Sequence, residues 1–291
     1  MKQSIDLPAG TLHYDTYGDP GGEPVVFVHG FAIDGRVWTP VAERLAAAGL
    51  HCLVPTWPFG SHTTPMRPDA ELAPPAAARL VNDFLAALGL ERVTIVGNDS
   101  GGAVVQLLVT QLLTSQDRSR IGRLVLTNCD SFENFPPGVF KLMSRMARIP
   151  GVGTAMLQPM RFERFLRGTS GYGALTTTRL PTELLRSFIA PMLTDRGVRR
   201  DALKFFGAAD ARDTIAAGAL LPQVDVPALL VWGADDTFFT LAQAERIAAA
   251  LPDATLVPVP DAKTYVSLDQ PEVVADAIAA FVSPRVSQDT V

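Results

Sequence analysis

The residues best suited to chemistry lie at positions 97–102, which read Gly-Asn-Asp-Ser-Gly-Gly. The mostly apolar and β-branched run at 92–96 before them predicts a strand, and residues 103–108 after them predict a helix. A sharp turn between a strand and a helix strains the backbone at its apex, so the neighbouring residues must be small. The segment therefore predicts a carboxylate or a hydroxyl held at the tip of a strand as a nucleophile.

Two residues compete for the apex of this turn. Asp99 fits because Gly97 and Gly101 then occupy the flanking positions that must be small. With Ser100 at the apex, Asn98 would take one of those positions, so the spacing favours Asp99. An ordinary glycine-rich turn without a chemical role is the simpler alternative.

The rest of the chain alternates short apolar runs with amphipathic helical patterns. Strands are predicted at 25–28, 52–54, 124–127, 229–233 and 255–259, and helices at 38–48, 75–88, 241–251 and 273–281. This order predicts an α/β fold with a parallel sheet and helices on both faces. An N-terminal hairpin is also expected, with the Asp-Pro-Gly-Gly turn at 19–22 between strands at 12–14 and 25–27.

The segment from about residue 130 to 221 interrupts this order. It is rich in Phe, Met, Leu and Arg at helical spacing and has no strand pattern. We predict a core domain of residues 1–130 and 219–291, with an inserted helical cap at 131–218. Sites in open α/β sheets lie beyond the carboxyl ends of the strands, where a cap can exclude water. A cap with only a structural role is the alternative, and a disordered tail is expected from about residue 283.

Composition excludes several classes of function. The 25 Lys and Arg residues are dispersed among 30 acidic ones, so no basic face is available for nucleic acid. The N-terminus has no apolar signal region, and no stretch approaches the roughly 18 uncharged apolar residues of a membrane span. Cys52 and Cys129 show no disulfide or metal-binding spacing. We expect a cytoplasmic protein that acts on a small-molecule substrate without a metal or cofactor; nothing in the sequence specifies an oligomeric state.

Several motifs together resemble the α/β-hydrolase fold, and within it the capped group with an aspartate nucleophile that includes epoxide hydrolases and haloalkane dehalogenases. The matching motifs are residues 29–31 after the third strand, the turn at Asp99, residues 232–236 after the seventh strand, and residues 260–262 and 269–271 after the eighth. The resemblance covers nearly the whole chain. It implies a mostly parallel, twisted, eight-stranded sheet flanked by helices, with an inserted helical cap.

The resemblance also implies roles for individual residues. Asp99 matches the nucleophile that attacks an alkyl carbon and forms an ester with the substrate. The backbone N–H groups of Phe31 and Ser100 match the oxyanion hole. Asp236 matches the acid that orients a catalytic histidine.

The catalytic histidine of the family is missing. The usual pattern Pro-Asp-Ala-Gly-His reads Pro-Asp-Ala-Lys-Thr here, with Lys263 and Thr264 at its last positions. Thr264 cannot accept a proton from water at neutral pH, and a general base contributes roughly 10² to 10⁴ in rate. His62, in the loop after the fourth strand, is the candidate replacement base. A solvated histidine without a catalytic role is the alternative.

Further departures narrow the reaction. The halide-binding side chains of the dehalogenases correspond to Ser100 and Phe31, which disfavours dehalogenation. Epoxide opening needs acid donors, for which Tyr172 and Tyr265 are the candidates. Packing with the hydroxyl at the surface is the alternative for both. Substrate-binding positions are also expected at His29, Trp38, Asn128, Asp130 and Thr264.

Two functions follow from these patterns. The first is an enzyme most like an epoxide hydrolase, with Asp99 as nucleophile or general base on a small to medium apolar substrate. The second is a catalytically degenerate ligand-binding protein, favoured by the loss of the histidine. A haloalkane dehalogenase and an esterase that uses Ser100 are less favoured, and an engineered trap is disfavoured because Lys263 departs from the pattern as well. The retained aspartate turn, oxyanion hole and acid favour the enzyme.

Overall fold

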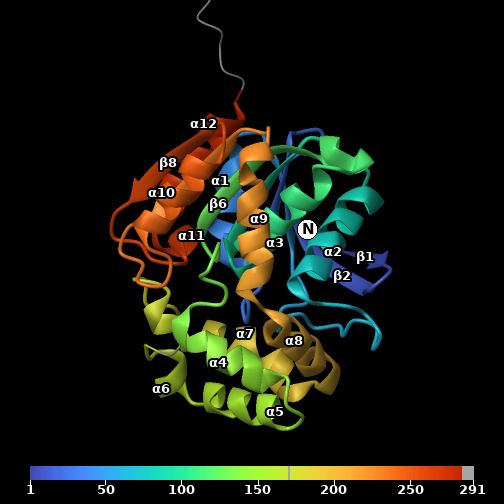
Figure 1. Cartoon of the computed structure of the whole chain (residues 1–291), viewed down its shortest axis with the longest axis vertical. Helices are drawn as coiled ribbons and strands as arrows, with labels where there is room; N and C mark the ends of the chain where they lie inside the picture. The colour runs from blue at the N-terminus through green and yellow to red at the C-terminus, as the bar shows by residue number, and fades with distance from the viewer. Residues whose placement is uncertain (170, 284–291) are drawn as a thin grey trace, which may run out of the picture.

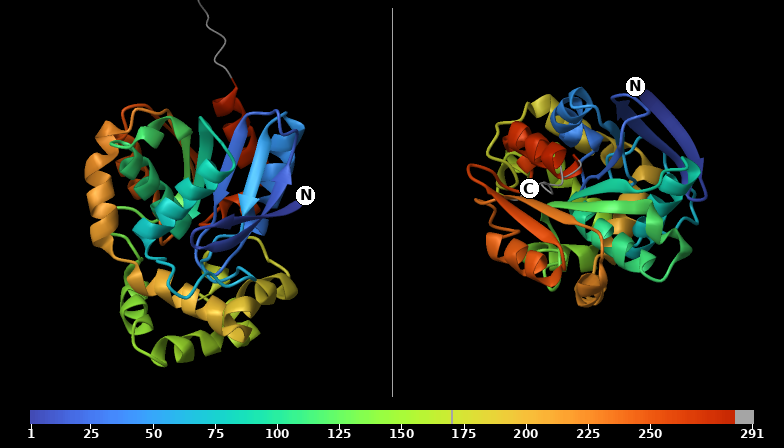
Figure 2. Two further views of the ribbon diagram at one scale, coloured as in Figure 1. Left: turned by 90° about the vertical axis from the view of Figure 1, so that its right-hand side faces the viewer. Right: turned by 90° about the horizontal axis from the view of Figure 1, so that it is seen from above.

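The computed structural model describes residues 1–169 and 171–283. A single sheet of eight strands forms the centre, helices cover both of its faces, and further helices lie beyond one end (Figure 1, Figure 2). This architecture confirms the expected α/β-hydrolase fold. The tail after residue 283, which was expected to be disordered, lies outside the described residues.

The sheet has the strand order β1-β2-β4-β3-β5-β6-β7-β8. Its strands are β1 (Lys2–Leu7), β2 (Gly10–Tyr17), β3 (Pro24–Val28), β4 (His51–Pro55), β5 (Val93–Asp99), β6 (Ile121–Cys129), β7 (Ala228–Gly233) and β8 (Ala254–Val259). Every neighbouring pair from β4 to β8 is parallel, whereas β1 and β2 pair antiparallel. The carboxyl ends of the parallel strands therefore meet at one edge, where a site is expected.

The N-terminal hairpin forms at a different place from the one predicted. β1 and β2 make the hairpin, with Leu7 paired to Gly10 across a tight turn. β2 then pairs with β4, so that β4 separates β2 from β3. The predicted hairpin through residues 19–22 is wrong, because a turn pattern shows where a chain reverses but not which strand lies beside it.

The helices form two layers and a separate group. They are α1 (Thr39–Ala47), α2 (Pro74–Ala87), α3 (Ser100–Leu112), α4 (Gly138–Ala147), α5 (Val152–Leu157), α6 (Glu163–Leu166), α7 (Thr182–Thr194), α8 (Arg196–Ala208), α9 (Ala211–Leu220), α10 (Leu241–Ala250), α11 (Val266–Asp269) and α12 (Pro271–Val282). Helices α1 and α12 pack on one face of the sheet, and α2, α3 and α10 on the other.

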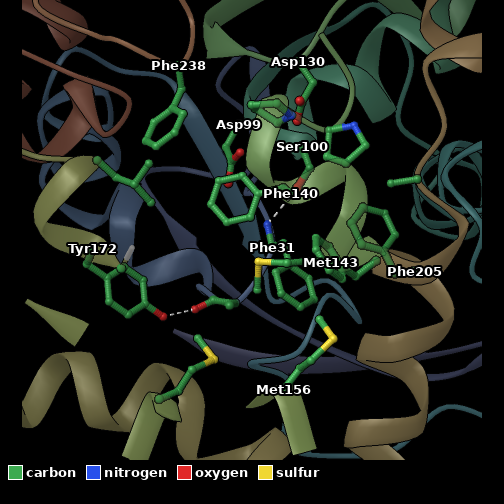
Figure 3. A pocket seen from close by; sticks show the side chains of 18 of the residues that line it. Phe31, Asp99, Ser100, Asp130, Phe140, Met143, Met156, Tyr172, Phe205 and Phe238 are labelled. Atoms are coloured by element: carbon green, nitrogen blue, oxygen red, sulfur yellow. Dashed lines mark hydrogen bonds between the residues drawn. The ribbon is translucent and has the colours of Figure 1, made fainter. Parts of the chain in front are cut away.

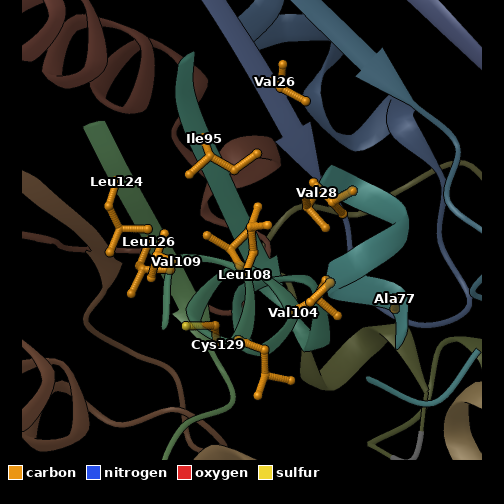
Figure 4. Close-up of a cluster of buried hydrophobic side chains, with 14 of the residues drawn as sticks. Val26, Val28, Ala77, Ile95, Val104, Leu108, Val109, Leu124, Leu126 and Cys129 are labelled. Carbon is orange, nitrogen blue, oxygen red and sulfur yellow. The ribbon is translucent and has the colours of Figure 1, made fainter. Parts of the chain in front are cut away.

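Alternating side chains of the central strands build the two cores. In β3, Val26 and Val28 belong to the core with α2 and α3, whereas Val25 and Phe27 belong to the core with α1 and α12. Figure 4 shows the first core around Leu108 of α3. Burial on both faces is typical of parallel strands and explains why their sequences are almost continuously apolar. Each buried Val, Leu or Phe contributes about 1.5–3 kcal/mol to stability. The packing of both cores therefore holds the ends of the strands in fixed positions.

Helices α4 to α8 lie together beyond the carboxyl end of the sheet (Figure 1). The chain enters this group directly after β6 and leaves it through α9. Helix α9, which the predicted division places within the cap, packs along α3 of the core. The group α4 to α8 thus covers the strand ends, as a cap over a site would.

The turn between β5 and α3 depends on a close approach of the backbone at Gly101. A Cβ atom at Gly101 would lie 2.4 Å from the backbone oxygens of both Val28 and His29. We predict that Gly101→Ala lowers the free energy of unfolding by about 3 kcal/mol, the upper range for overpacking. Gly138→Ala, where a Cβ has no atom within 4 Å, is the matched control and should change stability by less than about 0.5 kcal/mol. Urea unfolding followed by circular dichroism measures both, and equal stabilities would contradict the steric argument.

Candidate active site

Asp99 is the apex of the turn between β5 and α3. Its backbone has φ 53° and ψ −135°, a left-handed conformation that is strained for any residue with a side chain. A Cβ atom on Gly30 would lie 2.1 Å from Asp99 Oδ2, so the carboxylate rests directly against the backbone of the loop after β3. Ser100 is instead the first residue of α3. The structure therefore places Asp99 rather than Ser100 at the strained position.

Two backbone N–H groups lie at the Asp99 carboxylate. They belong to Phe31 and Ser100, and each stabilises the anion and lowers the pKa of Asp99. The Phe31 N–H also donates to Ser100 Oγ, 2.8 Å away. These are the two positions expected for the oxyanion hole, and the structure brings both of them to Asp99.

Burial controls the charge of Asp99. Removal from water raises the pKa of Asp99 to about 7, with a further increase from the negative charge of Asp236, against the opposing effect of the two N–H groups. A carboxyl group with a pKa near the ambient pH suits reaction as a nucleophile or as a general base.

The Asp236 carboxylate is held by four donors. Oδ1 accepts from the N–H groups of Phe238 (2.8 Å) and Phe239 (3.1 Å). Oδ2 accepts from the Thr264 hydroxyl (2.8 Å) and from Asn128 Nδ2 (2.9 Å). Thr264, where the resemblance predicts a histidine, thus donates to the carboxylate that such a histidine was expected to contact.

Asn128 has a different place from the one expected. It was predicted to line the substrate-binding wall, but its amide donates to Asp236 and to the backbone oxygen of Gly233 (2.9 Å) and accepts from the Gly233 N–H (2.6 Å). Its side chain is fully buried and ties the end of β6 to the end of β7. Asn128 is therefore a positioning residue for Asp236.

The cavity in front of Asp99 is apolar and has a volume of about 150 Å³. Figure 3 shows it between the ends of the strands and the cap helices. Its walls include Phe31, Phe140, Met143, Met156, Phe206 and Phe238. The polar side chains that reach it are Asp99, Ser100, Asp130, Tyr172 and Tyr265, and no His, Lys or Arg is among the described residues that line it.

Both candidate tyrosines line this cavity. The Tyr172 hydroxyl donates to the backbone oxygen of Ala32 (Figure 3), and the two phenol rings lie 6.4 Å apart. Tyr265 is 1% exposed. Burial raises the pKa of both phenols, so both keep their protons at neutral pH and can donate hydrogen bonds.

Asp130, which the sequence suggests as a polar wall residue, lines the cavity of Asp99. It follows the end of β6 and is 1% exposed. Its Oδ1 has no hydrogen-bond partner among the described groups. Burial and the charges of Asp99 and Asp236 raise the pKa of Asp130 well above its usual range. Among the described residues, no group of His, Cys, Asp and Glu is arranged to hold a metal ion, so these carboxyls do not form a recognisable metal centre.

His62 does not reach the Asp99 cavity. Its Nε2 lies 3.3 Å from Oδ2 of Asp201 in α8, and that oxygen also accepts from the Met66 N–H (2.8 Å). The cavity that His62 lines is a separate one, shared with His13 and Arg36. A buried carboxylate needs nearby donors, and Asp201 holds the loop of His62 to α8, away from the cavity of Asp99.

Two further expected substrate contacts are buried in the core. His29 is fully buried, with Nδ1 at 2.8 Å from the backbone oxygen of Gly30 and Nε2 accepting from the Trp57 N–H at 2.8 Å. Trp38 is fully buried against Phe27. Neither side chain lines the cavity of Asp99. Their expected substrate contacts are corrected to a loop-bracing role for His29 and a packing role for Trp38.

The chain belongs to the α/β hydrolase fold family, whose sequence profile matches residues 23–271. It is 28% identical over 258 residues to 2-hydroxy-6-oxononadienedioate/2-hydroxy-6-oxononatrienedioate hydrolase 1 of Dechloromonas aromatica, covering 84% of this chain and 81% of the relative. Similar solved structures include a haloalkane dehalogenase of Bradyrhizobium elkani (TM-score 0.79, 19% identity, 97% of each chain) and an epoxide hydrolase (TM-score 0.78, 18% identity, 98% and 99%). These comparisons confirm the expected family and fold. In the described part of the chain, no helix is both long and apolar enough for a membrane crossing.

Because the pKa of Asp99 is raised, its ionisation should destabilise the folded state by an amount that depends on pH. An unfolded chain has an ordinary Asp pKa of about 3.9, so between about pH 4 and pH 7 the native state binds more protons, and its stability falls as the pH rises. We predict that Asp99→Asn is more stable than the wild type at pH 8 by at least about 1 kcal/mol. The difference should shrink as the pH is lowered through 7. Urea unfolding at several pH values measures it, and the exposed Asp235→Asn controls for the loss of one charge. A difference that does not vary with pH would contradict the raised pKa.

The Thr264 hydroxyl predicts a second, separable effect on stability. Thr264→Val removes one of the two donors to Asp236 Oδ2 in a buried setting, which costs about 1–3 kcal/mol. Thr264→Ser keeps the hydroxyl and should lose clearly less. Urea unfolding of the two variants at pH 7 gives the comparison, and a larger loss in the serine variant would show that the methyl group rather than the hydrogen bond matters.

Proposed function

We propose that this protein is an enzyme in which Asp99 attacks an electrophilic alkyl carbon of a small to medium apolar substrate, in the manner of an epoxide hydrolase. The observation that carries the proposal is the Asp99 carboxylate, held in a strained turn at the end of an apolar cavity. The N–H groups of Phe31 and Ser100 beside it would stabilise the oxyanion formed when water attacks the resulting ester.

The acidic side chains that line the cavity favour a substrate without charged groups. Among the described residues that line it, the Asp, Glu, Lys or Arg residues are Asp99 and Asp130. The relative from Dechloromonas aromatica is named for dioate substrates, which carry two carboxylates. A dianion placed here would lose its hydration beside two carboxyl groups, without a cation to compensate. The substrate class of that relative therefore does not fit this cavity.

The available donors favour epoxide opening over dehalogenation. A departing alkoxide needs a proton donor, and the neutral phenols of Tyr172 and Tyr265 line the cavity. The indole N–H groups, which would bind a halide, are used or placed elsewhere. Trp57 Nε1 donates to the Phe27 oxygen, Trp232 Nε1 donates to the Phe239 oxygen, and Trp38 is in the core.

An esterase reaction at Ser100 has less support. Its hydroxyl accepts from the Phe31 N–H, and no His or Lys that could take its proton is among the described residues of the cavity. A serine hydroxyl needs such a base to become a nucleophile.

A binding function without turnover is the second candidate. The observation that favours it is the Thr264–Asp236 hydrogen bond, which satisfies the acid without a histidine. In this case the apolar cavity would bind a ligand of the same kind, and Asp99 would remain unmodified.

Alkylation of Asp99 distinguishes the two functions. We predict that incubation with 1,2-epoxyhexane or styrene oxide gives an ester at Asp99, detected by intact-protein mass and located by peptide mapping, or gives the diol product by way of that ester. Asp99→Asn should abolish both adduct and product. Ser100→Ala should keep them, because its hydroxyl is not the attacking group.

Each other outcome has a definite meaning. An adduct that persists in Asp99→Asn but disappears in Ser100→Ala would transfer the nucleophile to Ser100. The absence of both adduct and product, with ligand binding detected by calorimetry, would establish the binding function instead.

A further inference from the structure

Asp130 is a buried acid whose Oδ1 atom stands out in the described part of the chain because it lacks a hydrogen-bond partner. Its side chain is 1% exposed and Oδ1 is unpaired among the described groups. Buried polar atoms in native proteins are nearly always hydrogen-bonded, and an exception needs an explanation. Asp236, by contrast, receives four hydrogen bonds. The two carboxyl groups therefore differ: both oxygens of Asp236 accept hydrogen bonds, whereas Oδ1 of Asp130 has no partner among the described groups.

Asp130 and Asp99 face the same space. β5 and β6 are neighbouring parallel strands, with Asp99 paired to Cys129 in register, and the Asp130 N–H donates to the Asp99 backbone oxygen at 3.3 Å. Both side chains line the cavity and lie near each other in the close-up (Figure 3). A substrate atom bound at Asp99 would thus have Asp130 as its neighbouring titratable group.

We propose that Asp130 is the general acid and base of the reaction, in place of the family's histidine. This role rests on the proposed function, because it needs the ester at Asp99. Asp236 does not suit the role, since both of its oxygens are already engaged by donors. His62 does not suit it either, since it lines a different cavity.

In the first step, ionised Asp99 attacks an epoxide carbon. A bond forms between Asp99 Oδ and that carbon, the carbon–oxygen bond of the ring breaks, and the oxygen takes the proton of the Asp130 carboxylic acid. The products are a hydroxyalkyl ester at Asp99 and an Asp130 carboxylate. The raised pKa of Asp130 favours its protonated form before this step, and Tyr265 is an additional donor to the same oxygen.

In the second step, the Asp130 carboxylate accepts a proton from water. The water oxygen attacks the carbonyl carbon of the Asp99 ester, and the N–H groups of Phe31 and Ser100 bind the oxyanion. The ester bond then breaks, and the alkoxide leaves as the second hydroxyl of the diol. The proton that Asp130 accepted from water goes to the departing oxygen. The second proton of the water remains on the regenerated carboxyl group of Asp99 and then moves to Asp130, which leaves Asp99 ionised and Asp130 protonated as at the start. One residue thus serves as acid and then as base.

The test compares single-turnover reactions of the wild type, Asp130→Asn and Asp130→Glu with 1,2-epoxyhexane, followed by intact-protein mass and diol formation. In Asp130→Asn, Tyr265 remains as the donor of the first step, so the Asp99 ester should still form, although more slowly. An asparagine cannot accept the proton of water, so the ester should accumulate and its hydrolysis should slow about 10²- to 10⁴-fold. Formation of the ester also shows that the variant is folded and its nucleophile works. Asp130→Glu should recover part of the hydrolysis rate. The rate of ester hydrolysis in the wild type should depend on pH through the ionisation of Asp130, and this dependence should be absent in Asp130→Asn.

Three results would overturn the role of Asp130. Hydrolysis of the ester in Asp130→Asn at the wild-type rate would exclude it as the base. A wild-type ester that is as long-lived as that of the variant would show that neither protein has a base, while leaving Asp99 as the nucleophile. The absence of any ester or diol in all three proteins would reject the proposed function and with it the role of Asp130.

Discussion

The structure of this site depends on the burial of one carboxylate. Asp99 lies at a positive φ between β5 and α3, with its side chain against Gly30 and away from water. The rigid sheet below it compensates for the backbone strain and for the desolvation. Small residues at 30, 97, 101 and 102 let the backbone segments meet closely enough to hold it. Its raised pKa and the approach of the Phe31 and Ser100 N–H groups both follow from this placement.

Thr264, at the position where the resemblance predicts a histidine, alters the electrostatics around Asp99. Thr264 donates to Asp236, and the carboxyl groups of Asp99, Asp130 and Asp236 are all buried at this end of the sheet. In the described part of the chain, no His, Lys or Arg lines the cavity of Asp99 and Asp130. Each negative charge in such a cluster raises the pKa of its neighbours, which favours retention of a proton. A cluster that retains a proton can deliver it and take it back. This property is the physical basis for a carboxyl group in the role that the family gives to histidine.

Local steric rules and motifs predicted most of what surrounds Asp99. The glycine spacing predicted the strained turn, and the apolar runs predicted the strands, because both depend on neighbouring residues. The partners of side chains far apart in the sequence were not predictable in this way. His62 is separated from Asp201 by 139 positions, and no pattern in the loop signals that carboxylate. Asn128 and Asp130 both follow the apolar part of β6, and only the fold shows that one holds Asp236 while the other faces the cavity.

Isotope labelling of a single turnover tests the central claim, covalent reaction at Asp99, most directly. The wild type reacts with less than one equivalent of 1,2-epoxyhexane in water enriched in oxygen-18, and the peptide that contains Asp99 is then analysed by mass spectrometry. Hydrolysis of an Asp99 ester at its carbonyl carbon predicts one heavy oxygen in the Asp99 carboxylate and none in the diol of the first turnover. Heavy oxygen in the diol, with an unlabelled Asp99, would show direct attack by water and contradict a covalent role for this carboxylate.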